Sequence, residues 1–478
     1  MIQQQSSISN EPFFKYVFNF LKLESLMLRL GFNKRSGVSV FEVFMVTFTS
    51  VMYGHKTTYQ YHTSAIHKEE KVSRDAMYRV LKSQNYNWGL LLKAMVVRFI
   101  SFITSEVNPK QQPCCLVVDD TCLERPKSHK AELLSRIWDH VSQRYIRGYQ
   151  ELVLGWTDGI SFFPVLAKPV CSGDKNNRYC EADSKIDGRT LGGKLRKMAV
   201  MKKPEQVIAM CKEALAAGIK AEYMLFDSWF FSEYMLASLH ELGLNTISMV
   251  KSNLKFALTA DGETLSQQAV LRMLRQQRPC GRKAPILGET IACYHGIAVR
   301  LVFVRNRNNP EKSITIVSTD LNLSAEEIVQ LYVQRWKIET SFFSQKQYFG
   351  LDSECQAHKF DTINALMQLA NIRFAVAEFA RRLEEDLRTM GELFRNTSEL
   401  LHVLPFVDAC NRLIEAVNTE LRQKLLAAKV IIPGKEDEVM AMITDTLGSW
   451  LTGCINYIRD KITAFRLSVP QEQVRSNF

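Results

Sequence analysis

The stretch that decides the fold of this chain is Tyr332-Val-Gln-Arg335-Trp-Lys-Ile-Glu339-Thr-Ser-Phe-Phe-Ser-Gln-Lys346. It spaces a tyrosine, an arginine, a carboxylate and a lysine at i, i+3, i+7 and i+14. At about 3.6 residues per turn, these steps fall close to one face of a helix. Upstream, Ser324-Ala-Glu-Glu327 predicts a capping box that begins this helix. A carboxylate flanked by two cations suits a metal ion and a phosphodiester, because the acid holds the metal while the cations hold the strand.

The alternative for this segment is an ordinary amphipathic helix whose charges are solvated. Taken singly, each of the four polar residues fits that alternative about as well as it fits a functional site. The functional interpretation gains weight only when the four are read together with acids elsewhere in the chain.

The composition favours a globular protein with a polyanionic partner. A length of 478 residues predicts two to four domains, and 46% hydrophobic with 23% charged residues is typical of a soluble chain. The net charge of +11 raises the expectation of nucleic acid as a partner. The 11 cysteines include no CxxC pair, so we expect neither zinc ligation nor a disulfide framework. With no signal peptide and no membrane span recognised, we expect a cytoplasmic, nucleoid-associated protein.

Helical apolar spacing dominates residues 1–105, and we expect this region to be an N-terminal DNA-binding region. Within it, Ser73–Lys82 predicts a short basic helix with a serine N-cap. That helix is either the second helix of a helix-turn-helix DNA reader or an ordinary surface helix.

From Cys114 onward, strands alternate with helices. The predicted strands and helices, in chain order, are Cys115–Thr121, Gln150–Thr157, Ile160–Lys168, Pro204–Ala217, Glu222–Asp227, Ser232–Leu242 and Asn245–Val250. This order of three strands, helix, strand, helix and strand predicts an α/β fold with a ribonuclease-H-like mixed sheet. Its first part would be residues 106–250, and its last helix, with Glu339, would lie in residues 321–385. We expect residues 251–320 to be a β-rich insertion, with strands at Thr290–Tyr294, Ile297–Arg305 and Ser313–Ser318. We expect residues 386–478 to be a helical C-terminal region suited to dimerisation.

Three acids are candidates for one metal site. Asp120 and Asp227 each end a predicted strand, and Glu339 lies on a predicted helix. Three converging carboxylates repel one another unless cations bind, and oxygen ligands suit Mg²⁺ or Mn²⁺. Two such ions, about 4 Å apart, activate a water or a 3′-hydroxyl and stabilise the leaving oxygen. Alternation sends the side chains of Asp119 and Asp120 to opposite faces, so only one of them can be the main ligand.

At this point the chain resembles the DDE transposases of the bacterial insertion-sequence-four type. The resemblance covers roughly residues 110–380 and rests on three motifs. These are Asp119-Asp120-Thr121, Asp227 within Leu-Phe-Asp-Ser-Trp-Phe, and a Y-x2-R-x3-E-x6-K signature met by Tyr332, Arg335, Glu339 and Lys346. In the family the acid before the threonine is the ligand, so the resemblance favours Asp120, Asp227 and Glu339 as the catalytic metal ligands.

The resemblance implies cut-and-paste transposition of an insertion sequence. Water nicks one strand at the element end, the freed 3′-hydroxyl attacks the other strand to form a hairpin, and a second water opens it. The 3′-hydroxyl then attacks target DNA. The implied partners are double-stranded DNA at terminal inverted repeats, target DNA and a second copy of the chain in the synaptic complex. The alternatives are a ribonuclease-H-like nuclease without strand transfer and a domesticated DNA-binding protein.

The resemblance assigns DNA contacts to Tyr332, Arg335 and Lys346, near the scissile phosphate and a flipped base. Some family members stack that base on a tryptophan of the insertion, and residues 251–320 contain none. Either another aromatic residue substitutes, or the hairpin step differs. The candidate substitutes for this tryptophan are Phe256 and Tyr294, whereas Trp229 and Trp336 are expected in the core. Further residues are candidate DNA contacts, with solvated loop charges as the alternative: Arg125, Lys127 and Lys251.

Overall fold

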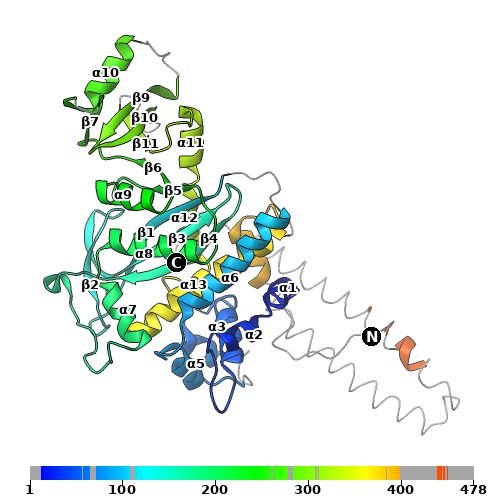
Figure 1. Cartoon of the computed structure of the whole chain (residues 1–478). Helices are drawn as coiled ribbons and strands as arrows, with labels where there is room; N and C mark the ends of the chain where they lie inside the picture. The colour runs from blue at the N-terminus through cyan, green and yellow to red at the C-terminus, as the bar shows by residue number, and fades with distance from the viewer. Residues whose placement is uncertain are drawn as a thin grey trace, which may run out of the picture. The chain divides into compact units, whose positions relative to one another are not determined.

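The structure is a computed structural model of the whole chain, drawn in Figure 1. It describes residues 12–55, 57–64, 71–107, 113–259, 262–277, 284–306, 309, 312–383, 385–398, 439–443, 445, 446 and 449. The chain divides into two compact units, Met1–Phe394 and Arg395–Phe478. Most of the predicted C-terminal helical region lies outside the described residues.

One mixed sheet of 11 strands runs through the first unit. Its catalytic half contains β1 (Cys115–Glu124), β2 (Ser135–Asp139), β3 (Arg144–Thr157), β4 (Phe162–Val170), β5 (Tyr223–Phe226) and β6 (Asn245–Met249). Strand β3 is antiparallel to β1 and β4, whereas β5 and β6 continue the sheet parallel to β1. The order β4-β3-β1-β5-β6, with two antiparallel steps followed by two parallel ones, is the ribonuclease-H-like arrangement. The predicted fold class is confirmed.

The insertion extends this sheet. It comprises β7 (Lys255–Ala257), β8 (Thr264–Ser266), α10 (Gln267–Gln277), β9 (Ile286–Tyr294), β10 (Ile297–Arg305) and β11 (Ser313–Ser318). Strand β11 pairs antiparallel with β6, so the insertion joins the catalytic half edge to edge. The predicted strands at β10 and β11 have the observed bounds. The helix α10 was not predicted.

Helices cover the sheet and form the N-terminal region. They are α1 (Pro12–Leu21), α2 (Leu23–Arg29), α3 (Val40–Ser50), α4 (Thr58–Thr63), α5 (Arg74–Leu81), α6 (Trp88–Phe102), α7 (Leu191–Ala199), α8 (Lys203–Ala216), α9 (Glu233–Glu241), α11 (Ala325–Val333), α12 (Trp336–Gln347) and α13 (Phe360–Leu383), with short turns at Ile103–Val107 and Lys175–Asn177. Ser73 caps α5 through the backbone N–H of Ala76, as predicted.

The helices α6 and α13 run side by side over the sheet (Figure 1), and both contact β4. Every residue of α13 from Phe360 to Ala380 is buried, which makes it the central helix of the unit. By length and composition alone, Trp88–Glu106 passes as a membrane span. It buries Leu92, Val96 and Phe99 against its neighbours, as the core helix of a globular domain also does.

The predicted single helix from Ser324 to Lys346 is two helices. The capping box between Ser324 and Glu327 begins α11 as expected. At Gln334 and Arg335, the backbone N–H groups donate to carbonyls three residues back, and the same spacing recurs at Lys337 and Ile338. Four of the five N–H groups from Gln334 to Ile338 therefore follow the tighter i→i−3 pattern, which interrupts the α-helix between Tyr332 and Glu339.

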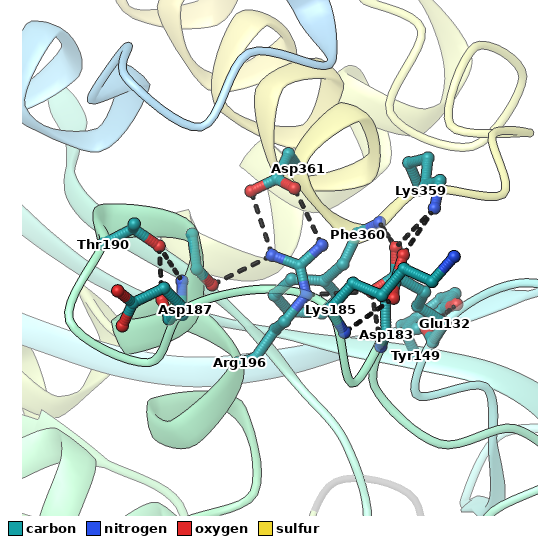
Figure 2. A network of polar contacts seen from close by, with 12 residues as sticks. Glu132, Tyr149, Asp183, Lys185, Asp187, Thr190, Arg196, Lys359, Phe360 and Asp361 are labelled. Carbon is teal, nitrogen blue, oxygen red and sulfur yellow. Dashed lines mark hydrogen bonds and ion pairs between the residues drawn. The ribbon is translucent and has the colours of Figure 1, made fainter.

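A buried ion network fixes the loops under α13 (Figure 2). The Arg196 guanidinium donates to both carboxylate oxygens of Asp361, at 3.1 and 2.7 Å, and to Glu132 at 2.8 Å. Arg196 lies in α7 and is buried. Gly193 is needed at the start of α7, because a Cβ there would lie 2.3 Å from the carbonyl oxygen of Asp187.

Candidate functional site

Strand register brings two acids together. In the parallel pair of β1 and β5, Val117 lies opposite Leu225. Asp119 and Asp227 each follow these partners by two residues, so both point to the same face of the sheet as the paired residues. Their electrostatic interaction raises the pKa of Asp119, as adjacent carboxylates do.

Arg335 joins the third acid to this pair. Its guanidinium donates to the Asp119 carboxylate at 3.1 Å and to the Glu339 carboxylate at 2.5 Å. Arg335 is largely buried and Glu339 is partly exposed. Arg335 therefore bridges Asp119 on β1 and Glu339 on α12, while Asp227, after β5, interacts electrostatically with Asp119.

The Asp119 carboxyl is under electrostatic strain. Burial raises its pKa to about 7, Arg335 opposes this rise, and the charges of Asp227 and Asp120 add to it. The single guanidinium of Arg335 does not offset the cost of burying the ionised form of this carboxyl. A further cation beside it would favour that ionised form.

Asp120, the acid that the resemblance favours as the metal ligand, points to the other face of the strand. Its carboxylate accepts from the Lys203 ammonium at 2.6 Å and from the Gln150 side-chain amide at 3.0 Å. Lys203 begins α8 and also lies 4.7 Å from the centroid of the Trp229 ring. Neighbouring residues of a strand point to opposite faces, and α12 packs on the Asp119 side. No sequence pattern marked Lys203 or Gln150, because both meet Asp120 only through the fold.

Within the described part of the chain, no three His, Cys, Asp or Glu side chains are gathered as a ready metal cage. The donor set nevertheless fits a hard divalent cation, because Asp119, Asp227 and Glu339 offer only carboxylate oxygens.

The signature residues Tyr332 and Lys346, on either side of Glu339, make contacts within the protein. Burial raises the pKa of Tyr332 to about 12, and its ring lies 5.8 Å from the Arg335 guanidinium carbon. The Lys346 ammonium donates to the Cys122 carbonyl of β1 at 2.7 Å. The structure thus places Lys346 over β1, beyond the acids toward the end of the strand.

Among the lower-ranked candidates, Arg125 is corrected. It is 2% exposed, and it donates to the carbonyl of Cys355 and the carboxylate of Asp352, so it is not available to DNA. Lys127 and Lys251 are exposed and remain candidate DNA contacts.

The aromatic assignments are also corrected. The proposed substitutes Phe256 and Tyr294 are buried, so neither presents a ring to a base. The tryptophans expected in the core are instead exposed: Trp229 by 42% and Trp336 by 59%. Trp229 follows Asp227 closely, and its backbone N–H donates to the Asp227 carboxylate at 2.9 Å.

Glu151 is a buried acid on the same face that the sequence did not mark. Burial raises its pKa from 4.5 to about 7, while a hydrogen bond from Asn371 and the charge of Lys346 oppose the rise. The folded protein therefore holds a proton that the unfolded chain releases, and this stabilisation disappears as the pH rises from about 4.5 through 7. We expect Glu151→Gln to remove this pH dependence of the unfolding free energy. The stability of the variant relative to wild type should therefore increase by roughly 3 kcal/mol from pH 5 to pH 8.

Urea unfolding of both proteins at the two pH values measures this change. Each variant is compared with wild type at the same pH, so other titrating groups cancel. A difference that does not vary with pH would show that Glu151 is not protonated in the folded protein.

The strand order, with Asp119 inside β1 and Asp227 directly after β5, defines a ribonuclease-H-like protein with an acidic centre. Residues 50–288, half of the chain, match the family described as DDE superfamily endonuclease. The chain belongs to this family. The matched span includes Asp119 and Asp227 and ends before Glu339.

No curated protein matches the chain. Among solved structures it is similar to one described as the "Drosophila P element transposase strand transfer complex", with 11% identity and a TM-score of 0.21, covering 92% of this chain and 87% of that one. A TM-score this low carries no argument about the fold or the chemistry.

Proposed function

We propose that this DDE superfamily endonuclease is a DNA transposase of the bacterial insertion-sequence-four type. The observation that carries the proposal is that Arg335 bridges Asp119 and Glu339, while Asp227 lies near enough to Asp119 to interact with its charge. Three acids brought together from β1, β5 and α12 are the arrangement that the strand-breaking chemistry requires. The spacing of Tyr332 and Lys346 about Glu339 matches the signature of the insertion-sequence-four type and supports the assignment to that type.

The three acids would hold Mg²⁺ or Mn²⁺, and we propose two ions. When bound, such ions activate a water or a 3′-hydroxyl and stabilise the leaving oxygen of a phosphodiester. Arg335 forms ion pairs with Asp119 and Glu339. Lys346 lies over β1 beside these acids, so both cations are placed to meet a phosphate held there, which supports their assignment as DNA contacts.

The proposed reaction is cut-and-paste transposition: strand nicking, hairpin formation and opening, and strand transfer by the 3′-hydroxyl. The aromatic requirement of the hairpin step falls on exposed rings near the acids, of which Trp336 adjoins Arg335 and Trp229 follows Asp227. An aromatic ring offers a base a stacking surface regardless of its sequence.

We propose double-stranded DNA at the element ends and target DNA as partners, with two copies of the chain in the synaptic complex. Residues 1–105 are the proposed DNA-binding region, where α5 exposes Arg74 and Arg79 on its outer side. Residues 386–478 are the proposed dimerisation region. A cytoplasmic location in bacteria follows from these partners.

Glu339→Gln tests the proposal. We expect it to abolish Mg²⁺-dependent nicking of supercoiled plasmid DNA and to leave DNA binding within about twofold, because the amide keeps the size of the side chain but loses its charge. Gel electrophoresis measures nicking, and fluorescence anisotropy measures binding. The matched control is Glu326→Gln, an exposed acid on α11, which should nick normally.

If Glu339→Gln lost DNA binding as much as it lost nicking, Glu339 would have a structural role and the proposal would be wrong. A second assay separates the transposase from the alternative nuclease without strand transfer. A labelled oligonucleotide with a free 3′-hydroxyl should become joined to plasmid DNA. Nicking without joining, on DNA that carries the element ends, would favour the nuclease.

A further inference from the structure

Arginines and aromatic rings alternate on the outer side of the β2–β3 hairpin. Arg136 and Trp138 lie on β2, and Tyr145 and Arg147 lie on β3. The two rings are exposed by 36% and 55%, respectively. We call these four residues the Arg–aromatic face. On the opposite side of the same strands, Ile137 and Ile146 are buried, so the hairpin is amphipathic.

Register places this face on the catalytic side of the sheet. Arg136 pairs with Arg147 and Trp138 with Tyr145, while Asp119 of β1 pairs with Val153 of β3. Paired residues in antiparallel strands share a face, and every second residue of a strand returns to it. The residues Tyr145, Arg147 and Val153 of β3 therefore point to the same side as Asp119. No bulge interrupts either pairing.

The four side chains form a ladder of cations and rings. The guanidinium carbon of Arg136 lies 3.9 Å from the centroid of the Tyr145 ring. The Trp138 and Tyr145 rings meet edge to face, with centroids 5.0 Å apart and an angle of 72°. The guanidinium carbon of Arg147 lies 4.4 Å from the centroid of Tyr179, which is itself exposed. Such contacts order the flat surfaces before any ligand arrives.

The charge of this face is unbalanced. Arg136 has no ion-pair partner in the part of the chain that the structure describes. Arg147 donates to the Ser128 carbonyl and contacts the His129 ring, so it too lacks a carboxylate there. The nearby acid Glu124 is paired with Arg144 at 3.0 Å, and both lie on the other side of the hairpin. An uncompensated pair of guanidiniums favours a polyanion as the occupant.

Lys346 links this face to the acidic centre. Its ammonium lies over Cys122 of β1, beyond Asp119 in the direction of the hairpin. It also interacts electrostatically with Glu151 of β3, which points to the same face as Asp119. Cations therefore continue from Arg335 through Lys346 to the hairpin, along one side of the sheet.

We propose that the Arg–aromatic face is a DNA-docking surface that holds the strand leading away from the cleavage centre. Arg136 and Arg147 contact phosphates, while Trp138 and Tyr145 contact sugars and unstacked bases. This assignment rests on the proposed function, since it names a further binding surface for the same DNA. Arginine, tryptophan and tyrosine are also frequent in protein interfaces, so a protein partner is the competing outcome of the test.

The test measures affinity for a short DNA duplex with a single-stranded extension, without divalent metal, at several salt concentrations. We expect the double variant Arg136→Ala/Trp138→Ala to bind about tenfold more weakly than wild type. Its slope of log affinity against log salt should shrink by roughly one, because one phosphate contact is lost. The conservative variants Arg136→Lys and Trp138→Phe should each keep most of the DNA affinity. Arg136→Lys should also keep the slope of log affinity against log salt.

Arg272→Ala on α10 is the matched charge control, because Arg272 is also an exposed arginine. It should leave affinity and slope unchanged. Equal loss in this control would mean that net charge alone decides binding, and would overturn the proposal. Unchanged DNA binding by the double variant would overturn the proposal as well. So would a variant whose oligomeric mass changes while its DNA affinity does not, because that result would indicate a protein partner. Thermal melting checks that the exposed substitutions leave the fold intact.

Carrying the same substitutions in the Glu339→Gln protein separates the two proposals. Binding is read there without any contribution from cleavage. A Glu339→Gln protein that still nicks DNA would remove the proposed function, while the salt slopes would still decide the role of the hairpin.

Discussion

Asp119→Asn is expected to abolish metal-dependent DNA cleavage, whereas Asp120→Asn is expected to retain much of it. Asp119 shares Arg335 with Glu339 and interacts with Asp227, while Asp120 pairs with Lys203 on the other side of the sheet. Loss of a carboxylate that holds a catalytic cation removes several kcal/mol of transition-state stabilisation. A loss of about 4 kcal/mol lowers the rate roughly a thousandfold.

Initial rates of plasmid nicking in Mg²⁺, with both asparagine variants side by side, measure the contrast. The two residues are neighbours in one strand, so each variant controls for the other. The structural assignment fails if Asp120→Asn is the dead variant and Asp119→Asn is active. Thermal melting of both proteins excludes unfolding as the cause of any loss.

Arg373→Met is expected to destabilise the protein by about 3–5 kcal/mol. Arg373 lies in α13 with 0% of its side chain exposed, and it pairs with the buried Glu354 at 2.5 Å. Its guanidinium also donates to the carbonyls of Thr47, Phe48 and Phe349. Removing it leaves a buried carboxylate without a cation and three carbonyls without their donor.

Urea unfolding measures this loss, and Arg74→Met, on the exposed side of α5, should change stability by less than about 0.5 kcal/mol. The double variant Arg373→Met/Glu354→Leu should recover part of the stability, because no unpaired charge remains. Recovery should stay incomplete, since the three carbonyls still lack a donor. A single variant as stable as wild type would mean that the ion pair does not hold α13 to α3.

Local patterns predicted the elements that depend on local interactions. The strands Ile297–Arg305 and Ser313–Ser318 have the predicted bounds, because turns and alternating apolar residues define them. The capping box at Ser324 was correct for the same reason. The strand β2 was missed, since five residues at the sheet edge with two charged side chains give little apolar signal.

Side chains whose partners lie far along the chain were predicted poorly. Arg125 looked like a loop charge, but Asp352 and the carbonyl of Cys355 reach it from the segment after α12. Trp336 looked apolar enough for the core, yet the junction between α11 and α12 leaves it exposed. Burial of a charge or exposure of a ring depends on which elements pack together.

The sequence by itself determined the type and order of most of the secondary-structure elements, and it marked Asp227 and Glu339 as candidate acids. It also determined that Asp119 and Asp120 point apart, because a strand alternates its side chains. Only the tertiary structure decided between them. The register of Val117 against Leu225 and the packing of α12 on one side of the sheet turn Asp119, and not Asp120, toward the other acids. Alternation is a property of the backbone, whereas the side that α12 covers depends on contacts between distant segments.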